Sequence, residues 1–170
     1  MTDTPDPADP TLACFRRVLG PRSGLDAVAA LRFARAAVTP LRVATLDAAG
    51  YPHITSLWFL LDAGHFICCT QRNAVLSRNL RRDPRAGFEL AVNEPPYRGL
   101  SGRAAAHFPA TDAATLLTAL ADRYLGERDP RLRRWLLSRA TSEVVIALEP
   151  LHLTGWDFSA RMSAPARADH

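Results

Sequence analysis

Small hydroxyl side chains stand out in two segments whose pattern otherwise favours branched apolar residues. Thr55 and Ser56 precede Trp58 and Phe59 in one segment, and Thr70 ends another. Such hydroxyls either hydrogen-bond a ligand or lie on a solvated strand face, and for Thr55 and Ser56 we favour the ligand site. Trp58 and Phe59 point to opposite faces of a strand, so one packs into the core and the other either belongs to the core packing as well or borders a groove.

Several common catalytic patterns are missing from the sequence. It contains no Ser-His-Asp set, paired-carboxylate motif, Walker loop or GxGxxG, so hydrolysis, phosphoryl transfer and Rossmann-type nucleotide binding have no support. Redox chemistry supplied by a bound cofactor remains, and it requires no dedicated acid or base from the protein. We therefore name no catalytic residue.

Metal and disulfide chemistry are also disfavoured. Cys14, Cys68 and Cys69 form no CxxC pair. The histidines lack metal-ligand spacing and are scattered through predicted strands and turns, among them His53, His65, His107 and His152.

The composition indicates a soluble protein that does not bind nucleic acid. The 170 residues include 21 basic ones, all arginine, and the net charge is +4. This arginine usage is typical of a GC-rich bacterial genome, with an actinobacterial origin expected. The arginines are spread over the predicted helices, turns and strands, which disfavours nucleic-acid binding. No apolar stretch approaches the roughly 20 residues of a membrane span, so we expect a cytoplasmic protein.

One domain over residues 23–162 is expected, with flexible tails at 1–22 and 163–170. Ser23, followed by Asp26, is the expected N-cap of a helix that ends at Thr39-Pro40. Asn73 is the expected cap of a helix over 74–82, and two more helices are predicted, over 112–125 and 130–139. Strands are predicted at 41–46, 51–61, 65–70, 85–92, 98–108, 143–149 and 151–158.

Tight turns join most of these strands, and the first three form two consecutive hairpins of an antiparallel meander. Helices do not alternate with the strands, which excludes a parallel βαβ sheet. The sequence therefore predicts a mainly β protein, a six- to seven-stranded antiparallel split β-barrel with inserted helices, because closure removes exposed edges.

Several motifs occur in an order that resembles the pyridoxamine 5′-phosphate oxidase-like superfamily of split barrels. They are Arg42-Val43-Ala44-Thr45-Leu46, Gly50-Tyr51-Pro52, Ser56-Leu57-Trp58-Phe59, Thr70, Arg78-Asn79-Leu80-Arg81-Arg82-Asp83-Pro84-Arg85, Gly102-Arg103-Ala104 and Trp156-Asp157-Phe158-Ser159-Ala160-Arg161-Met162. Members of that superfamily bind FMN, the deazaflavin F420 or haem.

The resemblance implies a homodimer with a cofactor groove between the two barrels. The C-terminal segment of one subunit would fold over the groove of the other. The cofactor-binding residues that it implies are Thr55, Ser56, Leu57, Trp58, Thr70, Arg72, Arg78, Asn79, Trp156 and Arg161.

The chain departs from the family pattern where the cofactor phosphate is usually held. A Ser-Arg-Lys-type cluster normally follows the threonine, and its positions fall on Ala74, Val75 and Leu76. Aliphatic side chains cannot neutralise a phosphate. Either Arg72 and Arg78 reach it, helped by backbone amides at the start of the 74–82 helix, or the groove has been remade for another cofactor, or it is empty.

The leading hypothesis is an FMN- or F420-dependent oxidoreductase that acts on a small conjugated substrate. Two alternatives stay open. One is a binding or sensing protein without a cofactor, and the other is a haem protein with His53 or His107 as the axial ligand.

Overall fold

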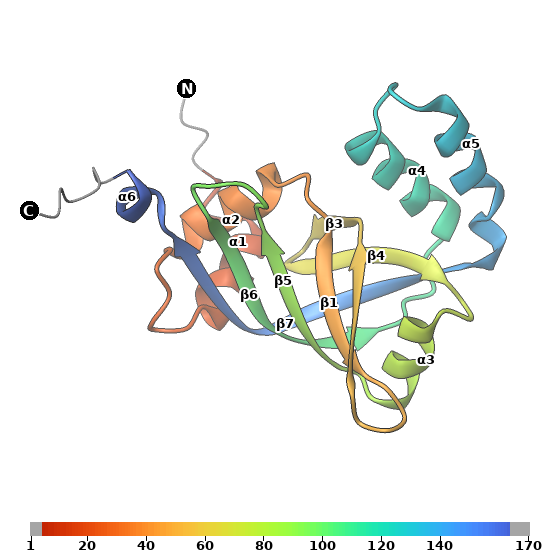
Figure 1. The fold of residues 1–170 in the computed structure, drawn as a ribbon, viewed down its shortest axis with the longest axis horizontal. Coiled ribbons are helices and arrows are strands. Elements are labelled where there is room, and N and C mark those ends of the chain that lie inside the picture. Colours follow the sequence, from red (N-terminus) through yellow and green to blue (C-terminus); the bar gives the residue numbers. More distant parts are fainter. Residues whose placement is uncertain (1–4, 164–170) are drawn as a thin grey trace, which may run out of the picture.

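A computed structural model describes residues 5–163, and its centre is a seven-stranded antiparallel sheet that curls into a split barrel (Figure 1). The strand order is β2-β1-β5-β6-β7-β4-β3. The bounds are Leu41–Leu46 for β1, Pro52–Leu57 for β2, Phe59–Asp62 for β3, His65–Gln71 for β4, Arg85–Ala91 for β5, Arg98–His107 for β6 and Glu143–Asp157 for β7. The prediction of a mainly β, antiparallel split barrel is confirmed.

Helices occupy both ends of the curled sheet (Figure 1). They are α1 (Pro10–Val18), α2 (Ala27–Ala36), α3 (Val75–Arg82), α4 (Ala113–Tyr124), α5 (Pro130–Ser138) and α6 (Ser159–Met162), with a short 3-10 turn at Ala140–Ser142. In Figure 1, α1, α2 and α6 lie at one end, and the α4–α5 pair lies at the other. None of the helices in residues 5–163 is long and apolar enough to cross a membrane.

The predicted meander is wrong, because the strand expected at 51–61 divides at Trp58. Its first part, β2, pairs with β1, and its second part, β3, pairs with β4. The two hairpins therefore lie at opposite edges of the sheet order. The break at Trp58 allows one chain segment to pass from one edge to the other, which brings β2 near β4 across the barrel.

The strands expected at 143–149 and 151–158 are one continuous strand, β7. Pro150 reads as a breaker in the sequence, but it lies beside a bulge, where a proline is tolerated in a sheet. Arg103 pairs with His152 and Ala104 pairs with Pro150, so Leu151 is the extra residue. The bulge turns the Leu151 side chain outward, and 58% of it is exposed.

The flexible tail expected over 1–22 is wrong for α1, which is part of the core. The Asp9 side chain caps this helix and Pro10 begins it. Phe15 is fully buried and lies 6.3 Å, between ring centroids, from Phe66 of β4. The helix also packs against Gly64, whose φ of +87° suits the β3–β4 turn and whose amide donates to Thr11.

Two predicted helix caps differ in the structure. Asp26, and not Ser23, caps α2, because its carboxylate accepts from the Ala29 amide at 2.8 Å. Ala74, and not Asn73, occupies the N-cap position of α3, which has no side-chain cap. The tail expected at 163–170 lies outside the described residues except for Ser163.

Candidate functional site

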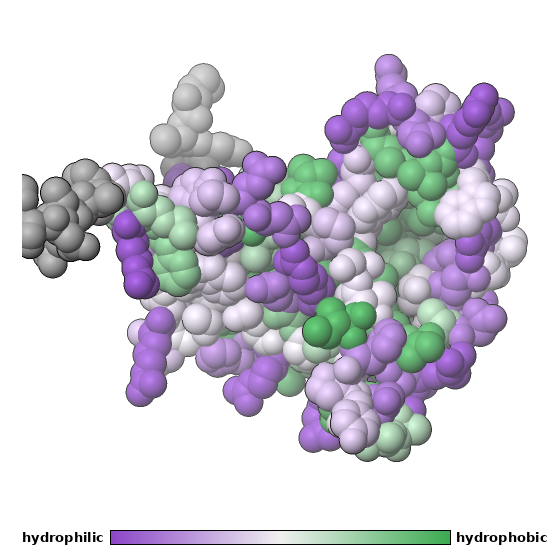
Figure 2. Space-filling model, viewed as in Figure 1, coloured by the Kyte–Doolittle hydropathy of each residue, from purple (hydrophilic) through white to green (hydrophobic). Residues whose placement is uncertain are grey.

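A cavity of about 270 Å³ lies where β2 ends, between the end of β4 and the α4–α5 pair. Its wall on the sheet side contains Ser56, Leu57, Trp58 and Thr70, all of which the sequence predicted as cofactor-binding residues. Figure 2 shows this part of the surface as a hollow beneath the α4–α5 pair. The structure therefore brings four of the ten predicted residues into one concave site.

Trp58 forms a rigid flat wall of the cavity. Its ring stacks on Tyr124 of α4, with centroids 4.9 Å apart and planes 5° from parallel. The Tyr124 hydroxyl accepts from the Phe59 amide at 3.3 Å and donates to the Thr39 carbonyl at 3.4 Å. Because burial raises the pKa of Tyr124, this hydroxyl stays protonated and keeps both bonds. The interruption of the sheet at Trp58 is thus fixed by a helix that lies far along the chain.

The polar side of the cavity is formed by the facing ends of β4 and β7. The side-chain amide of Gln71 donates to the Glu143 carboxylate at 2.7 Å and to the Ser142 hydroxyl at 3.0 Å. Cys69 lies beside them. Burial, together with the nearby Glu143 carboxylate, raises the pKa of this thiol to about 12, so Cys69 is a neutral thiol and not a nucleophilic thiolate at pH 7.

The α4–α5 pair supplies the opposite wall, which sequence reasoning missed. Leu117 and Leu120 of α4 contribute buried apolar surface, and Leu136 of α5 adds to it. Trp135 and Arg139 lie at the rim, where the guanidinium stands 4.4 Å from the centroid of the indole ring. The one sequence signal that could have pointed to this wall is Trp135, an aromatic residue on a short arginine-rich helix.

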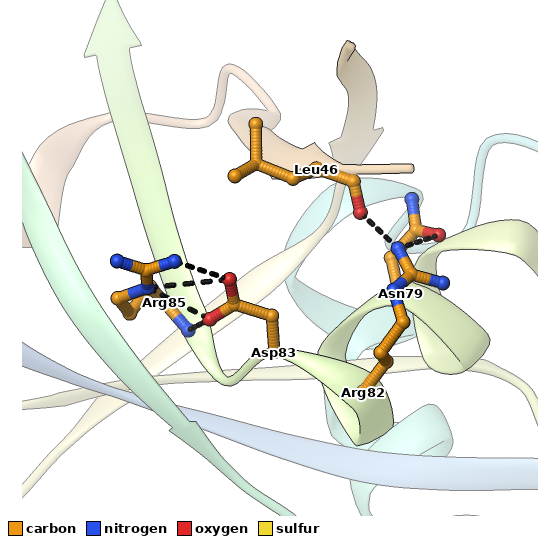
Figure 3. A network of polar contacts seen from close by, with 5 residues as sticks. All are labelled: Leu46, Asn79, Arg82, Asp83 and Arg85. Atoms are coloured by element: carbon orange, nitrogen blue, oxygen red, sulfur yellow. Dashed lines mark hydrogen bonds and ion pairs between the residues drawn. The ribbon is translucent and has the colours of Figure 1, made fainter. Parts of the chain in front are cut away.

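Asn79 has a structural role and does not line the cavity. Figure 3 shows Asn79 beside Arg82 of the same helix, which bonds to Leu46 at the end of β1. The Asn79 side chain is 3% exposed, donates to the Thr45 hydroxyl at 3.1 Å and accepts from Arg82 at 3.2 Å. Arg82 in turn donates to the Leu46 carbonyl. These bonds attach α3 to the end of β1, and a separate pair, Asp83 and Arg85, closes the turn from α3 into β5.

The remaining predicted residues also lie outside the lining of this cavity. Thr55 pairs with Val43 of β1, and its hydroxyl is 3.3 Å from the His53 ring. Arg72 and Arg78 are exposed, and Arg78 donates to the Asn73 carbonyl at 2.6 Å.

Trp156 and Arg161 lie at the far end of the molecule from the cavity. Trp156 is half-buried on β7, opposite Gly99, and Arg161 is exposed on α6. Figure 1 shows α6 and the α4–α5 pair at opposite ends. Within one chain these two residues therefore do not meet the four that line the cavity.

Neither histidine considered as a haem ligand lies in the cavity lining. His53 is beside Thr55, and His107 is paired with Glu149 at 3.3 Å on an exposed part of β6. Among the described residues there is no group of three or more histidine, cysteine and carboxylate side chains suited to hold a metal ion.

The start of α3 offers no cationic side chain at the family's phosphate positions. Leu76 is buried, Val75 is 39% exposed, and Ala74 caps the helix with its backbone alone. The positions at which the family pattern places a phosphate-binding cluster therefore carry no charged side chain in this protein.

The curled antiparallel sheet with its inserted helices is a split barrel of the kind found in the pyridoxamine 5′-phosphate oxidase-like superfamily. Residues 28–156 match the family model described as pyridoxamine 5′-phosphate oxidase, and the chain belongs to this family. No curated protein matches the chain in sequence.

Solved structures share the fold. A conserved hypothetical protein from Mycobacterium tuberculosis superposes with a TM-score of 0.71 at 19% identity, over 89% of this chain and 96% of that one. An F420 reductase gives 0.59 at 20%, over 71% and 92%. A heme storage protein from Vibrio cholerae gives 0.57 at 21%, over 72% and 89%. At these identities the likeness supports the fold alone.

Proposed function

We propose that the protein is a cytoplasmic homodimeric oxidoreductase that uses FMN or F420 to act on a small conjugated substrate. The observation that carries the proposal is the meeting of Ser56, Leu57, Trp58 and Thr70 at one cavity. Ser56 and Leu57 come from β2 and Thr70 from β4, two strands that are not neighbours in the sheet, and Trp58 follows β2 directly. Their convergence, together with membership of the family, makes this cavity the best-supported ring-binding site.

The cavity residues suit a flat ring with polar edges. Trp58, held by Tyr124, offers a fixed plane, and the hydroxyls of Ser56 and Thr70 supply hydrogen-bond donors at the rim. Leu117 and Leu120 keep water from the opposite side. A bound flavin or deazaflavin would supply the electron or hydride transfer, and these residues would orient its ring and exclude water.

The charged end of the cofactor is proposed to be held by arginines and not by the usual cluster. Arg72 and Arg78 flank the start of α3, where Ala74, Val75 and Leu76 provide no charge. F420 fits this arrangement at least as well as FMN, because its acidic tail can use dispersed arginines.

A dimer is supported by the outer face of the sheet. A mainly apolar groove of about 620 Å³ crosses this face, lined in part by Ala44, Leu46 and Leu151. Ile54 pairs with Ala44 on the edge strand β2 and is 67% exposed. An apolar face of this kind is typical of a protein–protein interface. We propose that a second copy covers this face. The partner's C-terminal segment, with Trp156 and Arg161, would then fold over the cofactor groove.

The visible spectrum of the purified protein, before and after titration with FMN, F420 and haemin, tests the proposal. We expect saturable binding of FMN or F420, weakened in Thr70→Val but not in Thr118→Val, a matched change on α4 outside the cavity lining. If neither FMN nor F420 binds, the oxidoreductase is refuted. The second candidate, a cofactor-free binding protein, is then favoured, and the aliphatic residues at 74–76 support it.

A further inference from the structure

We propose that Arg139, stacked on Trp135, joins Arg72 and Arg78 in binding the negatively charged end of the cofactor, where Ala74, Val75 and Leu76 supply no cation. This inference rests on the proposed function, because it assigns the anion subsite of that same cavity. Neither the family pattern nor the spacing along the chain points to Arg139, which lies 57 residues beyond the end of α3 in the sequence.

The fold places Arg139 beside the same strand end that the missing cluster would follow. The Arg139 carbonyl accepts from the Ser142 amide at 2.9 Å and from its hydroxyl at 2.8 Å. The Ser142 carbonyl in turn accepts from the Arg72 amide at 2.8 Å. Arg139 and Arg72 thus lie on the two segments joined across the β4–β7 end, just past Thr70. Arg139, at the C-terminal end of α5, therefore supplies a cation beside the strand end where α3 supplies none.

The charge of Arg139 is available for a ligand. Within residues 5–163, no carboxylate forms an ion pair with its guanidinium, whose one observed partner is the indole of Trp135. Glu143, the acidic residue in the cavity lining, accepts from Gln71 instead. A guanidinium stacked on an aromatic ring keeps its N–H groups free in its own plane, where they can form paired hydrogen bonds to a phosphate or carboxylate.

The loose packing of α5 also indicates that the α4–α5 wall of the cavity is left without a packing partner. None of the α5 residues is buried, and Trp135 is 52% exposed although it faces a cavity. An ion pair between Arg133 and Asp122 ties α5 to α4. A ligand between Trp135 and Trp58 would cover apolar surface that the protein alone leaves open, so α5 should become ordered more tightly when the cavity is filled.

Two ligand pairs, each sharing one ring system and differing in the charged end, test the inference. The pairs are FMN with riboflavin, which lacks the phosphate, and F420 with its deazaflavin that lacks the acidic tail. Affinities are measured by fluorescence titration of the full chain for wild type, Arg139→Gln and Arg131→Gln. Arg131 is an exposed arginine on the same helix outside the cavity lining and provides the matched control. Thermal melts confirm that both variants are folded.

We expect wild type to prefer the charged member of at least one pair, and Arg139→Gln to lose roughly 10- to 100-fold of that affinity, the usual range for a hydrogen bond to a charged group. Affinity for the uncharged member should be unchanged, and Arg131→Gln should behave as wild type. A preference that survives in Arg139→Gln, or a wild type that binds both members equally, would overturn the inference while the ring site stands. A wild type that binds neither member of either pair would refute the proposed function itself, and the inference with it.

Discussion

Replacing Asn79 by alanine should destabilise the fold without touching the ring site. The buried Asn79 amide makes two side-chain hydrogen bonds, to Thr45 at 3.1 Å and from Arg82 at 3.2 Å. At about 1 kcal/mol net for each bond, the free energy of unfolding should fall by about 2 kcal/mol. For a chain of this size that corresponds to a decrease in Tm of roughly 4–8 °C.

Thermal unfolding followed by circular dichroism measures this loss. Asn73→Ala is the matched control, because Asn73 is exposed and its side chain does not cap α3, so its Tm should stay close to that of wild type. Cofactor affinity of Asn79→Ala, measured well below its Tm, should equal that of wild type. An unchanged Tm would refute the structural role of Asn79. Lost affinity at full stability would show that Asn79 acts in binding instead.

Three further predictions follow from charge and exposure. Arg85 lowers the pKa of Asp83 to about 2 from 3.8, so the Asp83 carboxylate stabilises the fold above pH 4 and loses this contribution as the pH falls toward 2; in Asp83→Asn this acid-sensitive part should be absent from urea unfolding curves measured between pH 4 and 2. The raised pKa of Cys69 predicts slow alkylation by iodoacetamide at pH 8, and Glu143→Gln should speed it, whereas a rate equal to that of a free thiol in wild type would contradict the assignment. Ile54→Glu places a charge on the proposed dimer face and should yield a folded monomer by light scattering, and an unchanged mass would argue against that face.

Local patterns in the sequence predicted the strands well because each strand depends on nearby residues. In β1, Leu41 and Val43 alternate with Arg42 and Ala44, and the structure buries Leu41 and Val43 completely. What the sequence did not show is which strands meet. The break at Trp58 is set by stacking on Tyr124, a contact between residues 66 positions apart, and no local pattern encodes it.

Helix α1 shows how the same signal was interpreted in two ways. Asp129-Pro130 was correctly predicted to start a helix, but Asp9-Pro10, which has the same form, was assigned to a tail because more prolines and aspartates precede it. The apolar face of α1 is buried because Phe66 packs against Phe15 in the folded chain. Tertiary packing, and not propensity, decides such a short helix.

The candidate site was predictable on its sheet side and not on its helix side. Ser56 and Thr70 were found because the family resemblance fixes their order along the strands. Trp135 and Arg139 come from an inserted helix pair, and their place at the cavity depends on how α4 and α5 pack over the barrel. Asn79 belonged to the same motif as its neighbours, but burial gave it a structural role.

A crystal structure of the protein grown with saturating FMN or F420 tests the central claim most directly. The account predicts ring density in the cavity beside Ser56, Trp58 and Thr70, under the α4–α5 pair. Ring density elsewhere on the molecule, or no ring density in crystals grown with either compound, would contradict it.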